Sequence, residues 1–290
     1  MTRKPAILLM IVLLLGIGAC SSANTDGADE ASSRKVSAKP VADRFDVGDH
    51  SLYIKCSGGK PPTVIFEAGL PIDSTPYIPI ALELEEVTRT CVYDRASEGR
   101  SDDREGVATG LDVVDELDAL LEVAEVAEPY VLVGHSFGGL LVMLYAAEHP
   151  DEIAGLVLID PTHPDTYSEF DAVLGGNMFA RLKTAEFSKE PVDVDAAIAE
   201  FEARRDDLPQ VPLTVISAIL DLEPPPTWPA DRGFPFHKLQ RIWLKGHKDY
   251  SSMIPGAKVV FSETGHQVQE ENLELVIEEI AEVVDKARSR

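Results

Sequence analysis

The fold class is decided by one stretch of sequence, Tyr130-Val131-Leu132-Val133-Gly134-His135-Ser136-Phe137-Gly138-Gly139. Its first four residues predict a buried strand, and residues Phe137 to His149, which end before a proline, predict a helix. A direct strand-to-helix turn has no room for side chains two positions either side of its central residue, so glycine is needed at 134 and 138. Such a turn presents Ser136 at the carboxyl end of a sheet as a candidate nucleophile. The alternative is a purely structural turn.

A serine hydroxyl is a weak nucleophile unless a base removes its proton. Of the seven histidines, His266 is placed best, because it follows a predicted strand, Lys258–Phe261, and precedes the last predicted helix, from about Glu270 to Ala287. His135 lies inside the turn, where packing is its expected role, and His247 lies on a predicted helix, where we expect a surface position. We therefore predict His266 as the general base.

Two aspartates are candidates for the acid that orients this histidine. Asp160 ends the apolar run Leu156–Ile159, and Asp221 follows the next predicted strand. Either stands at a strand's carboxyl end, and either has a plainer explanation, as a turn cap for Asp160 or as a solvated loop residue for Asp221. The residues alone leave this choice open.

Acyl transfer also needs donors for a negatively charged oxygen. One candidate is the backbone N–H of Phe137, directly after the serine, and the other is the N–H of Leu70 in the loop after the third predicted strand. Gly69 in that loop has the alternative role of a simple turn residue.

The rest of the chain alternates short β-rich runs with amphipathic stretches, which is typical of a mostly parallel sheet connected by helices. A helix is predicted from Thr109 to about Glu125, and an insertion over about 161–210 carries two further helices. The predicted strands are Arg44–Val47, Ser51–Cys56, Thr63–Glu67, Thr90–Asp94, Tyr130–Val133, Gly155–Ile159, Leu213–Ser217 and Lys258–Phe261.

The amino terminus has the features of a signal peptide over residues 1–19. Two basic residues precede an apolar run from Ala6 to Leu15, which gives way to small residues. A retained membrane helix is the alternative, but the run is shorter than the roughly 20 residues that a span requires. The segment Ile17-Gly18-Ala19-Cys20 resembles the lipobox of bacterial lipoproteins, which implies lipidation of Cys20 and a membrane anchor; ordinary secretion is the alternative.

Residues 20–42 are polar and predict a flexible tether, which leaves 43–290 as the folded domain. Cys56 and Cys91 would share an oxidising compartment after export, so we predict a disulfide, against the alternative of two buried thiols. The formal net charge of −24 argues against nucleic-acid binding, which depends on basic side chains.

The chain resembles the α/β-hydrolase superfamily from about residue 43 to 288. The resemblance rests on the Ser136 turn, the Gly69-Leu70-Pro71 loop, the segment Tyr93-Asp94-Arg95 with Gly99-Arg100-Ser101-Asp102, and Gly265-His266, all in family order. It implies a mostly parallel eight-stranded sheet with a helical cap after strand six, and no cofactor or metal. It also implies that strands two and four are neighbours, which would place Cys56 beside Cys91.

For the acid, the resemblance offers two positions. The usual family position after strand seven corresponds to Asp221, whereas relatives with a stretch like Ile159-Asp160-Pro161-Thr162-His163-Pro164-Asp165 use the aspartate after strand six, so we favour Asp160. Two departures from the family pattern, Ala68-Gly69 for His-Gly and Arg95-Ala96-Ser97-Glu98-Gly99 for Arg-Pro-Gly-x-Gly, remove no catalytic group.

The resemblance implies a serine hydrolase that acts on small-molecule carboxylic esters through an acyl-enzyme. Peptide, lactone or carbon–carbon bond hydrolysis on the same residues is an alternative, because one fold hosts all of these reactions. Serine at position 136 disfavours dehalogenation and epoxide opening, which generally use an aspartate there. A non-catalytic ligand-binding lipoprotein is the alternative of another class, and it predicts a disabled triad.

Overall fold

The computed structural model describes residues 39–175, 190–219 and 233–290, which belong to one compact unit. The predicted signal peptide, Cys20, most of the tether and Asp221 lie outside the described residues, so lipidation and export stay predictions. Within the described ranges, no helix is both long and apolar enough to cross a membrane.

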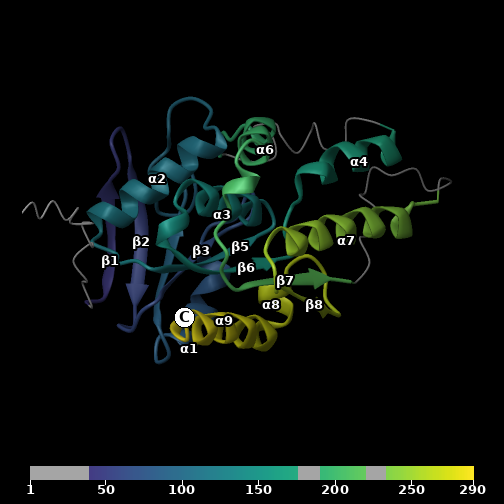
Figure 1. Cartoon of the computed structure of the whole chain (residues 1–290). Coiled ribbons are helices and arrows are strands. Elements are labelled where there is room, and N and C mark those ends of the chain that lie inside the picture. The colour runs from purple at the N-terminus through teal and green to yellow at the C-terminus, as the bar shows by residue number, and fades with distance from the viewer. Residues whose placement is uncertain (1–38, 176–189, 220–232) are drawn as a thin grey trace, which may run out of the picture. The chain divides into compact units, whose positions relative to one another are not determined.

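Eight strands form a single mixed sheet in the order β1-β2-β4-β3-β5-β6-β7-β8 (Figure 1). Strand β2 pairs antiparallel with both β1 and β4, and all other neighbours pair in parallel. The predicted mostly parallel eight-stranded sheet is therefore confirmed. The strands are β1 (Val41–Asp46), β2 (Ser51–Ser57), β3 (Thr63–Glu67), β4 (Arg89–Asp94), β5 (Tyr130–His135), β6 (Ile153–Ile159), β7 (Leu213–Ala218) and β8 (Lys258–Ser262).

A disulfide joins the two cysteines that were predicted to pair. Cys56 of β2 lies opposite Cys91 of β4 in the antiparallel register, and both side chains are buried. Their pairing confirms the predicted disulfide and ties the antiparallel edge of the sheet to its parallel part.

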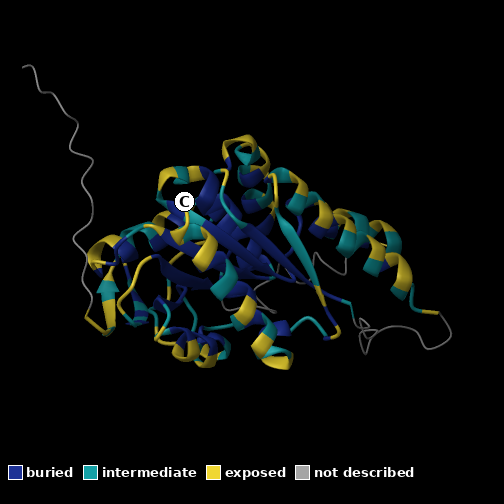
Figure 2. Ribbon diagram, turned by 60° about the horizontal axis from the view of Figure 1, so that its bottom comes forward, coloured by how far each residue is buried: buried dark blue, intermediate teal, exposed yellow. Residues whose placement is uncertain are grey.

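Helices cover both faces of the sheet (Figures 1 and 2). On one face α2 (Gly110–Val123), α3 (Phe137–Glu148) and α7 (Phe236–Met253) pack on the strands, with α6 (Val194–Glu202) on α2 and α3. On the other face lie α1 (Ile78–Leu84), α8 (Val268–Glu271) and α9 (Leu273–Arg288). α4 (Pro164–Leu174) packs against α7, and the short 3-10 helices are η1 (Thr75–Tyr77), η2 (Pro150–Glu152) and η3 (Arg205–Asp207).

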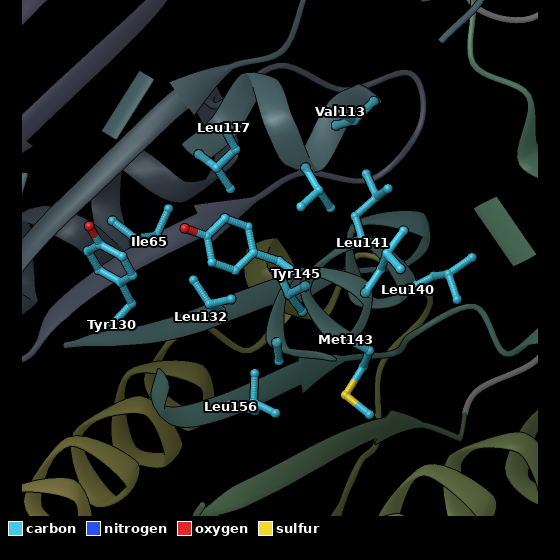
Figure 3. Close-up of a cluster of buried hydrophobic side chains, with 14 of the residues drawn as sticks. Ile65, Val113, Leu117, Tyr130, Leu132, Leu140, Leu141, Met143, Tyr145 and Leu156 are labelled. Atoms are coloured by element: carbon cyan, nitrogen blue, oxygen red, sulfur yellow. The ribbon is translucent and has the colours of Figure 1, made fainter. Parts of the chain in front are cut away.

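The central strand β5 is buried on both faces because its side chains alternate between two apolar cores. Tyr130 and Leu132 point toward α2 and α3, in the cluster drawn in Figure 3, and Val131 and Val133 point toward α9. Each fully buried aliphatic side chain of this kind contributes about 1.5–3 kcal/mol through apolar burial. The predicted continuous apolar strand is therefore buried at the centre of the sheet, and Ser136 follows its last residue, His135.

Two details of the predicted helices differ from the structure. The single helix predicted from Glu270 to Ala287 is two helices, because Asn272 adopts a non-helical backbone and its side chain accepts a hydrogen bond from Leu275 N. The predicted insertion at 161–210 contains α4 and α6 between β6 and β7, and its residues 176–189 lie outside the described residues.

Candidate active site

Ser136 occupies a sharp turn between the end of β5 and the start of α3. Its backbone has φ 53° and ψ −120°, a conformation that side-chain-bearing residues rarely adopt. The turn is tied to the neighbouring strand, because Ser136 N donates to Ile159 O at 3.0 Å. The serine hydroxyl is thereby carried past the carboxyl end of the sheet, as the sequence pattern predicts.

Three glycines make this turn sterically feasible. A Cβ at Gly134 would lie 2.4 Å from Gly138 O, and a Cβ at Gly138 would lie 2.4 Å from Glu67 O of β3. A Cβ at Gly139 would lie 2.6 Å from Pro161 Cβ, just beyond β6. The predicted requirement for glycine is confirmed, since the first turn of α3 touches the backbone of two neighbouring strand ends.

The structure brings Ser136, His266 and Asp160 into one hydrogen-bonded row. His266 Nε2 lies 2.9 Å from Ser136 Oγ, and His266 Nδ1 lies 2.6 Å from Asp160 Oδ2. The imidazole is 34% exposed whereas the aspartate is 3% exposed, so the row runs from an accessible base to a buried acid. Of the two aspartates left open by the sequence, Asp160 contacts the histidine, and Asp221 is outside the described residues.

Both carboxylate oxygens of Asp160 accept hydrogen bonds. Its Oδ1 accepts hydrogen bonds from Ala218 N at 2.9 Å and from the indole Nε1 of Trp243, in α7, at 2.8 Å. Burial opposes ionisation, but the hydrogen bonds from His266 and Trp243 and the nearby histidines outweigh it and lower the pKa of Asp160. The carboxylate is therefore ionised at neutral pH and aimed at the imidazole.

Trp243 was missed by the sequence analysis. The signal that identifies it is helical spacing: Leu239, Gly246, His247 and Tyr250 are the buried residues of α7, and position 243 falls on the same face. Its ring also lies edge-on to His266, at 5.6 Å between centroids. Helix α7 therefore contributes a side chain that contacts both Asp160 and His266.

His247 is buried, with 1% exposure, so the expected surface position is wrong. It shares the inward face of α7 with Trp243, where its Nε2–H donates to Pro161 O at 3.0 Å and its Nδ1 accepts from Ser217 Oγ at 2.7 Å. Burial lowers the pKa of His247 to about 4, so the ring is neutral near pH 7. It fixes the chain that follows Asp160 without joining the hydrogen-bonded row.

His135 holds the backbone of His266, the middle member of the row. Its Nε2–H donates to the backbone oxygen of His266 at 2.9 Å, and burial lowers the pKa of His135 to about 3. The expected packing role is therefore accompanied by a bond that anchors the loop carrying the base. That loop is further tied by Gly265 N, which donates to Glu271 Oε2 at 2.9 Å.

The two predicted oxyanion donors lie on segments that meet at Ser136. A Cβ at Gly69 would lie 3.1 Å from Ser136 Cβ, so the loop that contains Leu70 is in contact with the serine turn. Phe137 is the first residue of α3, where backbone N–H groups have no partner within the helix and the helix dipole favours negative charge. The arrangement can accommodate a charged oxygen next to the serine.

One group in the described ranges has the spacing of a metal site, at the opposite end of α3 from Ser136. It consists of Asp118, His149 and Glu152. The hydroxyl of Tyr145 lies 3.3 Å from Asp118 Oδ1 and 3.1 Å from Glu152 Oε2, so both carboxylates already have a polar neighbour.

Known proteins resemble this chain in sequence and in fold. A family model described as alpha/beta hydrolase fold matches residues 62–233. The chain is 31% identical over 175 residues to the uncharacterized protein YqjL of Bacillus subtilis, and the match covers 58% of this chain and 66% of YqjL. The chain thus spans less than two thirds of that relative.

Two solved structures share the fold. A thermophilic esterase from Thermogutta terrifontis matches with a TM-score of 0.58 and 21% identity, over 86% of this chain and 99% of the esterase. The enol-lactonase from Burkholderia xenovorans LB400 matches with a TM-score of 0.59 and 18% identity, over 84% of this chain and 100% of the lactonase. At these identities both show the fold alone. The family match covers more than half of the chain and shows that this chain belongs to the alpha/beta hydrolase fold family.

Proposed function

We propose that this protein is a serine hydrolase that cleaves carboxylic esters with Ser136 as nucleophile, His266 as general base and Asp160 as the orienting acid. The observation that carries the proposal is the unbroken row from Ser136 Oγ through both ring nitrogens of His266 to Asp160 Oδ2, at 2.9 and 2.6 Å. A non-catalytic binding protein has no need of this row.

In the acylation step, His266 Nε2 takes the proton of the Ser136 hydroxyl while Oγ attacks the ester carbonyl. The carbonyl π electrons move to oxygen, and the N–H groups of Leu70 and Phe137 stabilise the resulting charge. The ionised Asp160 accepts from Nδ1–H and stabilises the imidazolium. Collapse of the tetrahedral species expels the alcohol, which receives the proton from His266 Nε2.

Deacylation repeats these steps with water in place of the serine. His266 removes a proton from water, the hydroxide oxygen attacks the acyl carbonyl, and Ser136 leaves as the alcohol with the proton returned by Nε2. The products are the carboxylic acid and the free enzyme, and neither step needs a cofactor.

Esters are proposed ahead of peptides or carbon–carbon bonds because an alkoxide is an easier leaving group than an amide anion or a carbanion. The family membership supports a hydrolase in general, and the named structural neighbours include an esterase and a lactonase. A lactone is a cyclic ester, so the same row of residues would serve it.

The experiment is hydrolysis of p-nitrophenyl esters from acetyl to palmitoyl, with a γ-lactone and a p-nitroanilide peptide as competing substrate classes. We expect turnover of short or medium esters that is lost in Ser136→Ala and kept in Ser252→Ala, an exposed serine of α7. Turnover of the lactone alone would move the proposal to that class. No Ser136-dependent turnover of any class would contradict it.

A further inference from the structure

Arg95 lies buried at the end of β4, beside the loop that carries Leu70. All five of its N–H groups have partners: Nε–H donates to Glu190, Nη1 to Glu67 Oε1 and Ala68 O, and Nη2 to Gly69 O and Glu190. A guanidinium has five donors in a fixed plane, so its geometry is used completely. One side chain thus joins three segments of the chain.

The positive charge of Arg95 faces two buried glutamates, Glu67 and Glu190, and burial raises the pKa of Glu67. Glu190 accepts in bidentate fashion at 2.6 and 2.8 Å, and Glu67 of β3 accepts from the opposite side. Glu67 also accepts from the hydroxyl of Tyr93. Burial opposes the charge of Arg95, but the carboxylates raise its pKa well above the ordinary value, so the guanidinium stays charged.

The carbonyl groups of Ala68 and Gly69 are the part of this network that bears on chemistry. In a planar trans peptide the C=O and the following N–H point in opposite directions. Arg95 Nη2 donates to Gly69 O at 2.9 Å, so the N–H of Leu70 is directed away from the guanidinium. A donor at the carbonyl also polarises the peptide and strengthens its N–H as a donor.

The same loop is confined on its other side by the serine turn. A Cβ at Gly138 would lie 2.5 Å from Ala68 O, and one at Gly69 would lie 3.1 Å from Ser136 Cβ. The loop is therefore clamped between the guanidinium and the first turn of α3, and the Leu70 peptide has little freedom to rotate.

Glu190 brings the cap insertion into this clamp. It lies between β6 and β7 in sequence, just before α6, and its neighbours are fixed to the segment before α2: Ala108 N donates to Pro191 O at 2.6 Å and Asp193 N donates to Ala108 O at 2.7 Å. The carboxylate therefore approaches Arg95 from an anchored backbone.

We propose that Arg95 and Glu190 are positioning residues for the oxyanion site, with the cap residue Glu190 holding the guanidinium that sets the direction of the Leu70 N–H. This inference rests on the proposed function. It adds that a residue of the cap insertion, outside the nucleophile, base and acid, controls transition-state stabilisation. Lysine cannot replace Arg95, because three donors on one nitrogen cannot reach two carbonyls and two carboxylates.

The test compares wild type, Ser136→Ala, Glu190→Gln, Arg95→Lys and Glu279→Gln. Glu279 is the matched control, a buried glutamate paired with Lys258 at 2.8 Å on β8 and α9, away from the serine. For each protein, kcat and KM on a p-nitrophenyl ester are measured with two inhibition constants. One is for an arylboronic acid, which forms a tetrahedral adduct with serine, and the other is for the carboxylate product.

We expect Glu190→Gln to lower kcat by about tenfold and Arg95→Lys by about 100-fold, with KM and product binding changed less than about twofold. Boronate binding should weaken by the same factor as kcat, because both report the tetrahedral state. Glu279→Gln should lower thermal stability but leave kcat and boronate binding unchanged. A purely structural role of the clamp would make Glu190→Gln behave like Glu279→Gln, which would overturn the inference.

The outcomes separate this inference from the proposed function. If wild type shows no Ser136-dependent turnover, the proposed function and the clamp's role are both contradicted. If turnover depends on Ser136 but boronate binding is unchanged in Glu190→Gln, only the clamp is contradicted. Should Arg95→Lys fail to fold, the near-isosteric Glu190→Gln decides alone.

Discussion

Two adjacent turns at the carboxyl edge of the sheet are built by different physical means. Ser136 after β5 and Asp160 after β6 both have positive φ, 53° and 42°, and each backbone N–H donates to the next strand. The serine turn is held by steric exclusion, through glycines within three residues of it. The aspartate is held by hydrogen bonds from residues 58, 83 and 106 positions away. The nucleophile thus depends on local packing, and the acid depends on α7 and the His266 loop.

The largest effect is expected where the acid's charge is removed. Asp160→Asn replaces the acceptor of His266 Nδ1–H by an amide, which favours the wrong tautomer of the base and removes the charge that stabilises the imidazolium. We expect kcat/KM on a p-nitrophenyl ester to fall by about 10⁴-fold. The fold should persist, as measured by circular dichroism.

Asp249→Asn is the matched control. Asp249 of α7 faces another histidine, His163, at 3.0 Å and is not part of the hydrogen-bonded row. Its variant should keep kcat/KM within about twofold of wild type. Equal losses in the two variants would show that any broken Asp–His pair disturbs activity, contrary to the assigned role of Asp160.

Gly138→Ala tests the close packing at the serine turn. The added methyl group would lie 2.4 Å from Glu67 O and 2.5 Å from Ala68 O, and backbone atoms cannot move as a flexible side chain would. We expect the free energy of unfolding to fall by about 3 kcal/mol, at the upper end of the cost of overpacking, in urea titrations. Gly233→Ala, with nothing within 4 Å of the new Cβ, should change it by less than about 0.5 kcal/mol.

Lowering the pH should reduce the free energy of unfolding, because each of the two turns lies next to one buried neutral histidine. The pKa of His135 is lowered from 6.5 to about 3 and that of His247 to about 4, so between these values and pH 6.5 the unfolded chain binds protons that the folded chain does not. Stability is therefore lost as pH falls below 6.5, by at most about 1.4 kcal/mol per pH unit for each histidine.

His247→Gln tests this assignment, because glutamine can both donate to Pro161 O and accept from Ser217. Unfolding free energies at pH 7, 6 and 5 should show a slope reduced by about one proton in this variant. Asp160 has a pKa below its ordinary 3.8, so its contribution is retained throughout this window and lost only as pH falls further, through the folded value. An unchanged slope would contradict the neutral state of His247.

The smallest effect is expected from Trp243→Phe. The change removes the indole N–H at Asp160 Oδ1 but leaves the bond from Ala218 N. A hydrogen bond to a charged group contributes about 1.5 kcal/mol, so kcat/KM should fall by about tenfold. In an Asp160→Asn background the same change should cost less than about twofold. Additive losses would indicate that the tryptophan acts through packing alone.

The contrast between the two turns also explains what the sequence could predict. The strand Tyr130–Val133, the serine turn and its glycines follow from short-range sterics and continuous apolarity, so they could be predicted from adjacent residues. Asp160 and Asp221 could not be distinguished in this way, because both follow strands that end at the same edge of the sheet. The choice depends on which carboxylate meets Trp243, Ala218 and His266 in the folded chain.

The features that the sequence did not predict have a common cause. His247 was assigned to the surface from its helix alone, although its burial depends on which face of α7 meets β7. The helix break at Asn272 depends on a local side-chain bond that apolar periodicity does not register. The partnership of Arg95 with Glu190 joins residues 95 positions apart. Each case needs the packing of distant segments or hydrogen bonding that hydrophobic patterning omits.

The proposed function requires Ser136 to be an activated nucleophile. The most direct measurement is labelling of the purified domain with a fluorophosphonate probe, followed by mass spectrometry of the modified peptide, in wild type, Ser136→Ala and Asp249→Asn. We expect one adduct, on Ser136, in wild type and Asp249→Asn, and none in Ser136→Ala. A folded wild-type domain that is not labelled, or is labelled on another residue, would contradict it.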